Sequence, residues 1–368
     1  MKYPVYQPSL VGNEKKYVNE CLDSTWISSK GKFVQQFEST FAQFIDVPHS
    51  ASVCNGTVAL HLALEALGIG EGDEVIVPTL TYIASVNAIT YTGAKPVFVD
   101  SLEDTWQIDP KDVRQKITKN TKAVMCVHVY GHACDMDPLT TLCKEQDLFL
   151  IEDCAEAIGT LYKGRHVGSF GDVATFSFYG NKTITTGEGG MVVTHHRTLH
   201  DRMVHLKGQG LAKYREYWHD AVGYNYRMTN ICAAIGCAQM EQIDHILKKK
   251  KEIASWYQDA FKNTAIAFHQ EAPDTNHSYW MCTVLLPEHI DREVLKADLV
   301  TQGIETRPMF YPIHTMPIYS QKYEKHLVAE TLSRRGMNLP SYPELEKTDV
   351  AFIADALLGF IDTQHTNG

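Results

Sequence analysis

The chain has 368 residues, 44% of them hydrophobic, and a formal net charge of -10, which suits a large globular protein of two lobes or two domains. No stretch concentrates enough basic residues to follow a phosphate backbone, so we expect no nucleic-acid partner. The one basic run, Lys248 to Lys251, falls in a helical pattern, and we interpret it as a solvated helix face.

The cysteines and the N-terminus indicate the compartment. The nine cysteines are odd in number and scattered, without a Cys-x-x-Cys pair, which is typical of reduced thiols. The N-terminal residues lack the apolar core of a signal peptide, and no window approaches the roughly 18 apolar residues of a membrane helix. We therefore expect a cytoplasmic protein without a membrane partner.

Strand and helix patterns alternate through the first half of the chain. Strands are predicted at 51–54, 74–78, 95–100, 123–129 and 148–153, and helices at 58–67, 85–91 and 138–146. Repeated βα units of this kind imply a mainly parallel sheet covered by helices on both faces. Two more strands, 173–178 and 190–194, lie close together across a Gly-rich bend, and we expect them at one edge of the same sheet.

The order of predicted strands and helices changes in the last third of the chain. A long helical stretch at 230–261 is followed by a strand at 279–286, a helix at 292–302 and a strand at 304–307. These elements predict a smaller C-terminal α+β domain. The expected organisation is an α/β protein with a large domain over residues 1–245 and a small domain over 246–368.

Three motifs fall where parallel strands end, and ligands gather outside the carboxyl ends of such strands. The first, Cys54-Asn-Gly-Thr57, closes a short strand and opens a helix, so its free N–H groups and hydroxyl form a seat for a phosphate. An ordinary helix cap is the alternative interpretation.

The second and third motifs are Asp153 and Lys182. Asp153 ends an apolar strand, so its carboxylate emerges above the sheet, where a protonated pyridine nitrogen would pair with it. The alternative is a cap for a helix from Ala155 onwards. Lys182 lies in a polar, Gly-rich bend, either as a solvated lysine or as a Schiff-base lysine with a lowered pKa.

The order of the three motifs is more specific than any one of them. A phosphate seat, a carboxylate and a lysine at successive strand ends form one constellation. Ser177 could add a hydroxyl to the phosphate, and Tyr82 could stack on a ring.

The sequence resembles the vitamin-B6-dependent aminotransferases of nucleotide-linked sugars, which share the aspartate-aminotransferase fold. The resemblance runs from about Pro8 into the C-terminal domain. Its motifs are Trp26-Ile-Ser-Ser-x-Gly31, Asn55-Gly-Thr-x-Ala-Leu-His-Leu62, Pro78-Thr-x-Thr-Tyr-Ile-Ala84, His128-x-Tyr-Gly131, Ile151-Glu-Asp-Cys-Ala-Glu-Ala157, Phe176-Ser-Phe-x-Gly-Asn-Lys182, Gly187-Glu-Gly-Gly190 and Gly223-Tyr-Asn-Tyr-Arg-Met228.

This resemblance implies a cofactor, a fold and a set of roles. The cofactor is pyridoxal 5'-phosphate, bound in a fold type I domain with a seven-stranded type of sheet. Lys182 forms the Schiff base, and Asp153 pairs with the pyridine nitrogen. The other implied cofactor contacts are Gly56, Thr57 and Ser177 on the phosphate, Tyr82 on the ring, Glu156 where many relatives have Gln, and Asn225 on the phosphate of a neighbouring subunit, which implies a homodimer with shared active sites.

The resemblance also implies a reaction. The segments Val5 to Leu10, Tyr217 to Asp220 and Glu305 to His314 are similar to those of members that move the amino group of glutamate to C4 of GDP-4-keto-6-deoxymannose for O-antigen synthesis. UDP- or dTDP-linked keto sugars are alternative substrates. The implied substrate contacts are Ser28, Ser29, Arg307 and His314.

Other function classes have less support. His128 and His132 could pair on a metal, but no third ligand completes the set, and we expect none. No Gly-x-Gly-x-x-Gly lies between a strand and a helix, as a nicotinamide enzyme would require. A protein that binds pyridoxal phosphate or a nucleotide sugar without turnover stays open, although Lys182 and Asp153 argue against it.

Overall fold

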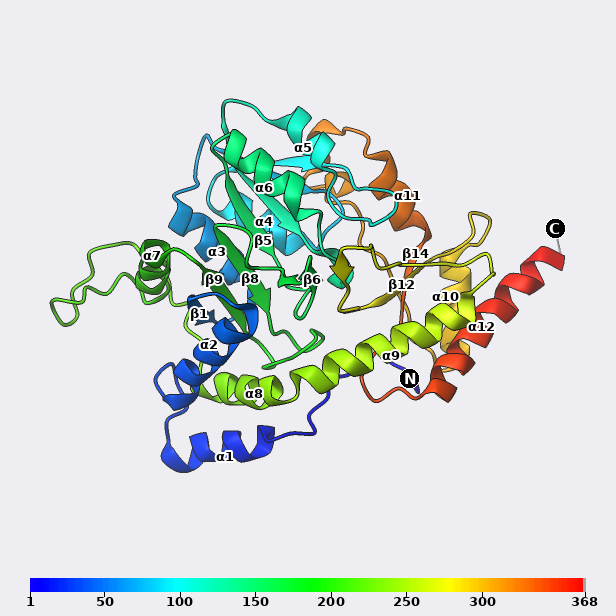
Figure 1. The fold of residues 1–368 in the computed structure, drawn as a ribbon, viewed down its shortest axis with the longest axis horizontal. Coiled ribbons are helices and arrows are strands. Elements are labelled where there is room, and N and C mark those ends of the chain that lie inside the picture. The colour runs from blue at the N-terminus through cyan, green and yellow to red at the C-terminus, as the bar shows by residue number, and fades with distance from the viewer. Residues whose placement is uncertain (367–368) are drawn as a thin grey trace.

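The structure, a computed structural model, describes residues 1–366 and is built around one large central sheet (Figure 1), which has seven strands. The strand order is β1-β9-β8-β5-β4-β2-β3. The bounds are His49–Val53 for β1, Glu74–Pro78 for β2, Lys95–Val99 for β3, Thr121–Val127 for β4, Phe149–Asp153 for β5, Val173–Ser177 for β8 and Gly190–Thr194 for β9. Only β9 runs against its neighbours, so the predicted mainly parallel sheet is confirmed.

The β8–β9 pair lies inside the sheet, although we expected it at one edge. The two strands pair as predicted, with Ser177 opposite Gly190. However, β1 continues the sheet beyond β9 in antiparallel register, with His49 opposite Thr194. The expected edge position of β9 is therefore wrong, because the first strand of the chain covers it.

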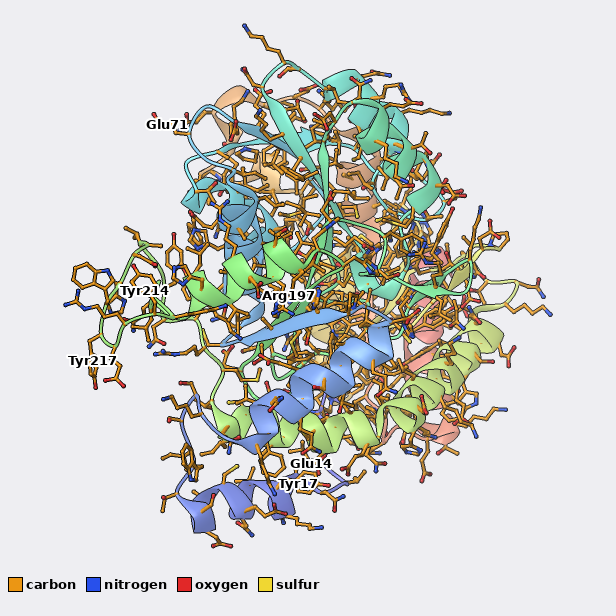
Figure 2. The ribbon with its side chains drawn as sticks, turned by 60° about the vertical axis from the view of Figure 1, so that its left-hand side comes forward. Glu14, Tyr17, Glu71, Arg197, Tyr214 and Tyr217 are labelled. Atoms are coloured by element: carbon orange, nitrogen blue, oxygen red, sulfur yellow. The ribbon has the colours of Figure 1, made fainter. Side chains whose placement is uncertain are left out.

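Helices cover both faces of the sheet because successive strand residues point to opposite sides. In β2, Val75 and Val77 pack with α3 (Gly56–Leu67), α4 and α7, while Ile76 packs on the other side with α2, α6 and α8. The remaining bounds are Lys32–Ile45 for α2, Ile83–Tyr91 for α4, Pro110–Lys116 for α5, Met136–Glu145 for α6, Arg197–Lys207 for α7 and Asn230–Glu241 for α8. α1 (Glu14–Ser24) lies outside α8, where the Tyr17 hydroxyl donates to Glu241 (Figure 2).

A second, smaller sheet has the order β10-β12-β14-β13 and is wholly antiparallel. Its strands are Ala267–Phe268 for β10, Cys282–Leu285 for β12, Arg307–Pro308 for β13 and Gly336–Leu339 for β14. Three helices accompany it: α10 (Arg292–Thr301), α11 (Leu327–Arg335) and α12 (Lys347–Thr366). A three-stranded sheet of order β11-β6-β7 is formed by Thr275–Asn276, Leu161–Tyr162 and Arg165–His166, and the short 3-10 helices are Val129–Gly131, Ile313–Thr315 and Ser320–Lys322.

The helical stretch predicted at 230–261 is two helices, since the chain turns at Gln242 between α8 and α9 (Ile243–Phe261). α9 joins two hydrophobic cores: Ile243 and Ile246 pack with the large sheet, and residues from Ile253 onwards pack with the small one. The N-terminal Tyr3 also packs in this second core. The division after residue 245 stays a prediction.

Lys250 contradicts the prediction of a solvated basic face. It is fully buried, and its Nζ donates to the carbonyl of Trp280 at 2.9 Å, to the hydroxyl of Ser341 at 3.1 Å and to the Ser341 carbonyl. Residue 250 lies in the apolar stripe of α9, between Ile246 and Ile253, so the helix buries it despite its charge. Burial lowers the pKa of this amine to about 8.

Within residues 1–366, none of the helices combines the length and the apolar character that crossing a membrane requires.

Candidate active site

The carboxyl ends of β1, β5 and β8 place the three candidate motifs on one edge of the large sheet. α3 begins at Gly56, directly after β1, and Asn55 caps it by accepting a hydrogen bond from the Val58 N–H at 3.0 Å. The N–H groups of Gly56 and Thr57 lie in the first helical turn, where an α-helix has no internal acceptor for them. They remain available to an anion at the positive end of the helix.

Gly56 lies against Ser177, the last residue of β8. A Cβ atom at position 56 would be 2.7 Å from the Ser177 Cβ and 3.0 Å from its Oγ, so only glycine allows this approach. The contact brings the Ser177 hydroxyl next to the first turn of α3. We call Gly56, Thr57 and Ser177 the phosphate seat, because together they offer two N–H groups and two hydroxyls to one anion.

Asp153 ends β5 and is 4% exposed. Its Oδ2 accepts a hydrogen bond from the Ser85 hydroxyl at 2.8 Å, and its Oδ1 accepts one from the Ala155 N–H at 3.1 Å. Burial raises the pKa of this carboxyl above its ordinary value, while these two donors act to lower it. The alternative of a cap is not supported, because no helix begins at Ala155.

Lys182 lies in the bend after β8, with its Nζ 3.5 Å from Glu156 Oε1. The other oxygen of Glu156 accepts a hydrogen bond from the Tyr130 N–H at 2.9 Å. Burial raises the pKa of Glu156 to about 7, against the lowering effects of the Lys182 amine and the Tyr130 N–H. The interpretation of Lys182 as a solvated lysine is wrong, because its side chain is only 11% exposed.

Two aromatic residues without a predicted role at the site hold Lys182 in place. The Trp280 ring centroid is 3.9 Å from the Lys182 Nζ, and the indole N–H donates to the Asn181 carbonyl at 2.7 Å. The Tyr6 hydroxyl donates to the Lys182 carbonyl at 2.6 Å. Both come from sequence positions remote from residue 182, so no local pattern could have pointed to them.

Tyr82 is 58% exposed, and its ring centroid lies 5.8 Å from that of Phe310. The two rings belong to an apolar hollow of about 230 Å³ formed by Thr81, Tyr82, Ile83, Pro308, Met309, Phe310, Tyr311 and Met316. This hollow lies between the end of β2 and the loop after β13. Tyr82, the predicted ring-stacking residue, thus lies beside the segment from Arg307 to His314, which carries two of the predicted substrate contacts.

The candidate substrate contacts are more dispersed. Arg307 is exposed and pairs with Glu305 at 3.1 Å. His314 is buried, with Nδ1 at 2.6 Å from the Thr79 hydroxyl and Nε2 at 3.2 Å from Glu330, so both ring nitrogens have partners inside the protein.

Three candidates lie apart from Lys182. Ser28 is exposed and Ser29 half-buried in the loop between α1 and α2, where the Ser28 carbonyl accepts from the Asn230 N–H at 2.6 Å. Asn225 is exposed, and its side chain accepts a hydrogen bond from Arg227 at 3.0 Å. The structure of the single chain does not join these residues to the other candidates.

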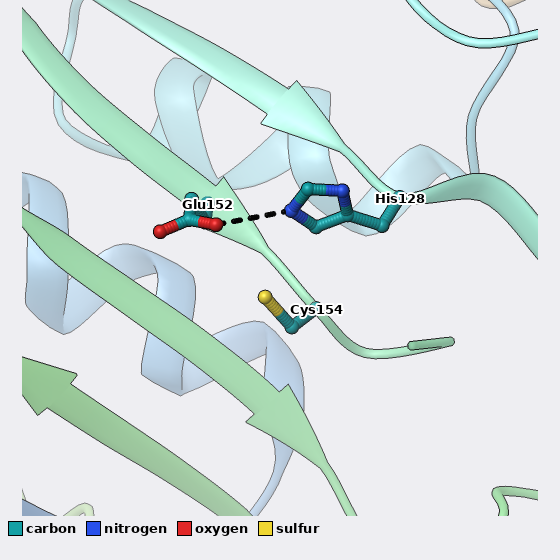
Figure 3. Close-up of side chains that lie close together, drawn as sticks. All are labelled: His128, Glu152 and Cys154. Carbon is teal, nitrogen blue, oxygen red and sulfur yellow. Dashed lines mark hydrogen bonds and ion pairs between the residues drawn. The ribbon is translucent and has the colours of Figure 1, made fainter. Parts of the chain in front are cut away.

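The His128 ring points towards Glu152 of β5 (Figure 3), whereas the ring nitrogens of His132 bond the Ala133 carbonyl and the Ala272 N–H. The ligand atoms of His128, Glu152 and Cys154 lie within 4.8 Å of one another, all buried. The His128 Nδ1 accepts from the Cys134 N–H at 3.0 Å, which leaves Nε2 to donate to Glu152 at 3.2 Å.

Glu152 also accepts hydrogen bonds from three backbone N–H groups, those of Gly168, Phe170 and Gly171. Although burial acts to raise it, the pKa of Glu152 is held below its ordinary value by His128 and these amides. The polar atoms of His128 and Glu152 are therefore satisfied by protein groups. Their evident role is to fasten the ends of β4 and β5, from which Asp153 projects.

The edge of the sheet fits pyridoxal phosphate. The cofactor presents a phosphate, a ring nitrogen that can be protonated and an aldehyde. The structure offers the phosphate seat, a buried carboxylate at Asp153 and an amine at Lys182. The close contact between Gly56 and Ser177 carries this fit, because it brings the serine hydroxyl next to the first turn of α3, whose N–H groups have no acceptor within the helix.

Comparison with known proteins gives the same assignment. Residues 8–358 match the family model described as the DegT/DnrJ/EryC1/StrS aminotransferase family. The chain is 62% identical over 361 residues to a GDP-perosamine synthase of Escherichia coli O157:H7, covering 98% of this chain and 99% of that protein. It is 51% identical over 363 residues to a GDP-perosamine synthase of Vibrio cholerae, covering 98% and 99%.

A solved structure of a sugar aminotransferase from Streptococcus pneumoniae in its PLP form superposes with a TM-score of 0.94 at 26% identity, covering 99% of both chains. The chain belongs to the DegT/DnrJ/EryC1/StrS aminotransferase family, and it is a transaminase that uses pyridoxal phosphate.

Proposed function

We propose that the chain moves the amino group of glutamate to C4 of GDP-4-keto-6-deoxymannose and so makes GDP-perosamine for O-antigen synthesis. The observation that carries the proposal is the 62% identity, over almost all of both chains, to a relative named GDP-perosamine synthase. The arrangement of Lys182, Asp153 and the phosphate seat at one sheet edge supports it, because a transaminase needs an amine, an acid and an anion site together.

The proposed catalytic residues are Lys182 and Asp153. When bound, pyridoxal phosphate supplies an aldehyde that carries the amino group and a ring that withdraws electrons from the reacting carbon. Lys182 holds and moves a proton at its Nζ. Asp153 keeps a negative charge beside the ring nitrogen, and the Ser85 hydroxyl and the Ala155 N–H keep that carboxylate in place.

The other proposed cofactor contacts orient the ring. Gly56, Thr57 and Ser177 donate hydrogen bonds to the phosphate, and Tyr82 covers one face of the ring. Glu156 lies beside the Lys182 amine. The four dispersed residues, Ser28, Ser29, Arg307 and His314, remain the proposed substrate contacts, and the hollow between Tyr82 and Phe310 supports a substrate position near the last two.

We further infer that the protein works in the cytoplasm as a homodimer with active sites shared across the interface, Asn225 reaching the phosphate of the partner subunit. The exposed side chain of Asn225 supports this inference. So does the loop after α7, which projects from the body and carries Tyr214 and Tyr217, 73% and 92% exposed (Figure 2), although large aromatic side chains are usually covered. Nine unpaired cysteines support the compartment.

A parallel set of reactions tests the proposed function. The purified protein is supplied with glutamate and, in separate reactions, with GDP-, UDP- and dTDP-linked 4-keto-6-deoxy sugars, and each product is analysed by mass. The expected result is an aminated GDP sugar, absent with the Lys182→Ala variant. Preference for a UDP or dTDP substrate would overturn the assignment of the sugar nucleotide. A protein whose cofactor absorption does not change with glutamate would indicate binding without turnover.

A further inference from the structure

Glu156 is the one buried acid that faces the Lys182 amine at short range in the described part of the chain. It is 4% exposed, in the turn that follows β5, and its Oε1 lies 3.5 Å from the Lys182 Nζ. Three groups from three elements surround it: Lys182 after β8, Asp153 at the end of β5 and Tyr130 after β4. Of these, Lys182 favours the ionised carboxylate, while the charge of Asp153 opposes it.

The hydrogen bond from Tyr130 does not explain why a carboxyl stands at this position. The Tyr130 N–H donates to Glu156 Oε2 at 2.9 Å, and a neutral amide oxygen would accept that bond equally well. The interaction with Lys182 is different, because a carboxyl beside an amine can carry the opposite charge and can take up a proton.

The Lys182 amine has a second neighbour that favours its charged form. Its Nζ lies 3.9 Å from the centroid of the Trp280 ring, and the ring is fixed because its indole N–H donates to the Asn181 carbonyl. A carboxylate and an aromatic face thus hold an ammonium group in a site that is 11% exposed at the lysine side chain. An ammonium nitrogen cannot attack an aldehyde, so the amine must lose a proton before it reacts.

We propose that Glu156 and the Trp280 ring hold the Lys182 amine whenever it is not bonded to the cofactor, and that the Glu156 carboxyl accepts the proton that the amine gives up. The proton moves from Lys182 Nζ to Glu156 Oε1, which converts an ammonium and a carboxylate into a neutral amine and a neutral acid. No proton enters or leaves the site in this step. The proposal rests on the role of Lys182 in the proposed function.

The pair should titrate as one unit with two apparent transitions. Between them one proton is shared by the two groups, and the fraction of neutral amine does not change with pH. Burial raises the pKa of Glu156 to about 7, so the range in which the proton is shared begins in the neutral range and extends above it. A lysine without the acid would show a single transition. At pH values below that transition, the fraction of neutral amine would rise about tenfold with each pH unit.

The test measures how fast Lys182 reacts with pyridoxal phosphate alone, without any sugar. Protein freed of cofactor is mixed with pyridoxal phosphate at a series of pH values through the neutral range, and the rate is followed by the absorption of the covalent adduct. The wild type should show a range in which the rate is independent of pH. Glu156→Gln, which keeps the Tyr130 hydrogen bond, should show a continuous rise to one transition.

Two further variants complete the test. Glu156→Asp keeps an ionisable group and should keep two transitions. Glu74→Gln is the matched control, because Glu74 is also buried and its carboxylate pairs with Lys95 at 2.7 Å. Glu74 begins β2, at the end of the strand that lies away from the site. The pH profile of this variant should therefore be that of the wild type.

Two outcomes would contradict this reasoning. Profiles of the same shape in the wild type and Glu156→Gln would assign Glu156 a positioning role only, even if the variant is slower by a constant factor. A wild type that forms no adduct would instead overturn the role of Lys182 itself. Failure to aminate a GDP-linked sugar affects neither result, because no sugar is present.

Discussion

Replacing Gly56 by alanine tests the phosphate seat directly. The new Cβ would lie 2.7 Å from the Ser177 Cβ, closer than such atoms approach, and 3.0 Å from its Oγ. Gly56 begins α3 and Ser177 ends β8, so each is held by a regular element. Either the first turn of α3 or Ser177 must move. We therefore expect the loss of at least one hydrogen bond to the bound phosphate.

The expected magnitude follows from the charge of the phosphate. A hydrogen bond to a charged group contributes about 1.5–3 kcal/mol, so the dissociation constant for pyridoxal phosphate should rise roughly tenfold to a hundredfold. The assay is a titration of cofactor-free protein with pyridoxal phosphate, followed by absorption. Gly359→Ala is the matched control, because a Cβ at that position in α12 meets no atom within 4 Å.

A double-mutant cycle identifies the route of the effect. If the alanine methyl acts by displacing the Ser177 hydroxyl, then adding Ser177→Ala to Gly56→Ala should cost little more than either change alone. Full additivity would mean that the α3 N–H groups are displaced instead. Unchanged affinity in Gly56→Ala would refute the assignment of the phosphate to this seat.

Two other predictions concern buried groups. Ser85→Ala removes the hydroxyl that donates to Asp153 at 2.8 Å, so the affinity for pyridoxal phosphate should fall by about tenfold; an unchanged titration curve would contradict a supporting role for Ser85. Burial lowers the pKa of His132 to about 4 from an ordinary 6.5. The folded state thus binds fewer protons than the unfolded one between these values, and stability is complete above pH 6.5 and decreases as the pH falls towards 4. The difference of 2.5 units corresponds to about 3 kcal/mol. Urea unfolding at neutral and acidic pH should show this loss, and His132→Gln should reduce it; an equal loss in the variant would argue against His132 as its source.

The sequence predicted those parts of the site that depend on local patterns. Asp153, Lys182 and the turn at Gly56 follow recognisable strands, and the ends of parallel strands meet at one edge of a sheet, so their convergence could be inferred without coordinates. The supporting residues could not be inferred. Tyr6 and Trp280 lie 176 and 99 positions from the residues whose carbonyls they bond, and no periodicity connects such distant segments.

Lys250 shows where residue type misleads, and His314 shows which contacts spacing leaves undetermined. A lysine in a basic run reads as a surface residue, yet position 250 falls in the apolar stripe of α9, and three acceptors satisfy its amine. His314 lies in the predicted substrate loop, but Thr79 and Glu330 occupy both of its ring nitrogens. In both cases the deciding factor is the partner provided by a distant element, which composition and spacing do not reveal.

Lys250 also connects α9 to the site. Its amine bonds the carbonyl of Trp280, whose ring faces the Lys182 amine, while Asp153 and the phosphate seat belong to the large sheet. The strand ends that carry Asp153 are therefore held together by the hydrogen bond between His128 and Glu152. The Trp280 ring over Lys182 is held in place through α9, which packs in both hydrophobic cores. The groups proposed to hold the cofactor, Asp153, Lys182 and the phosphate seat, are therefore positioned within the single chain. Arg307 and Asn225, by contrast, have exposed side chains, and their proposed roles require the substrate or a second subunit.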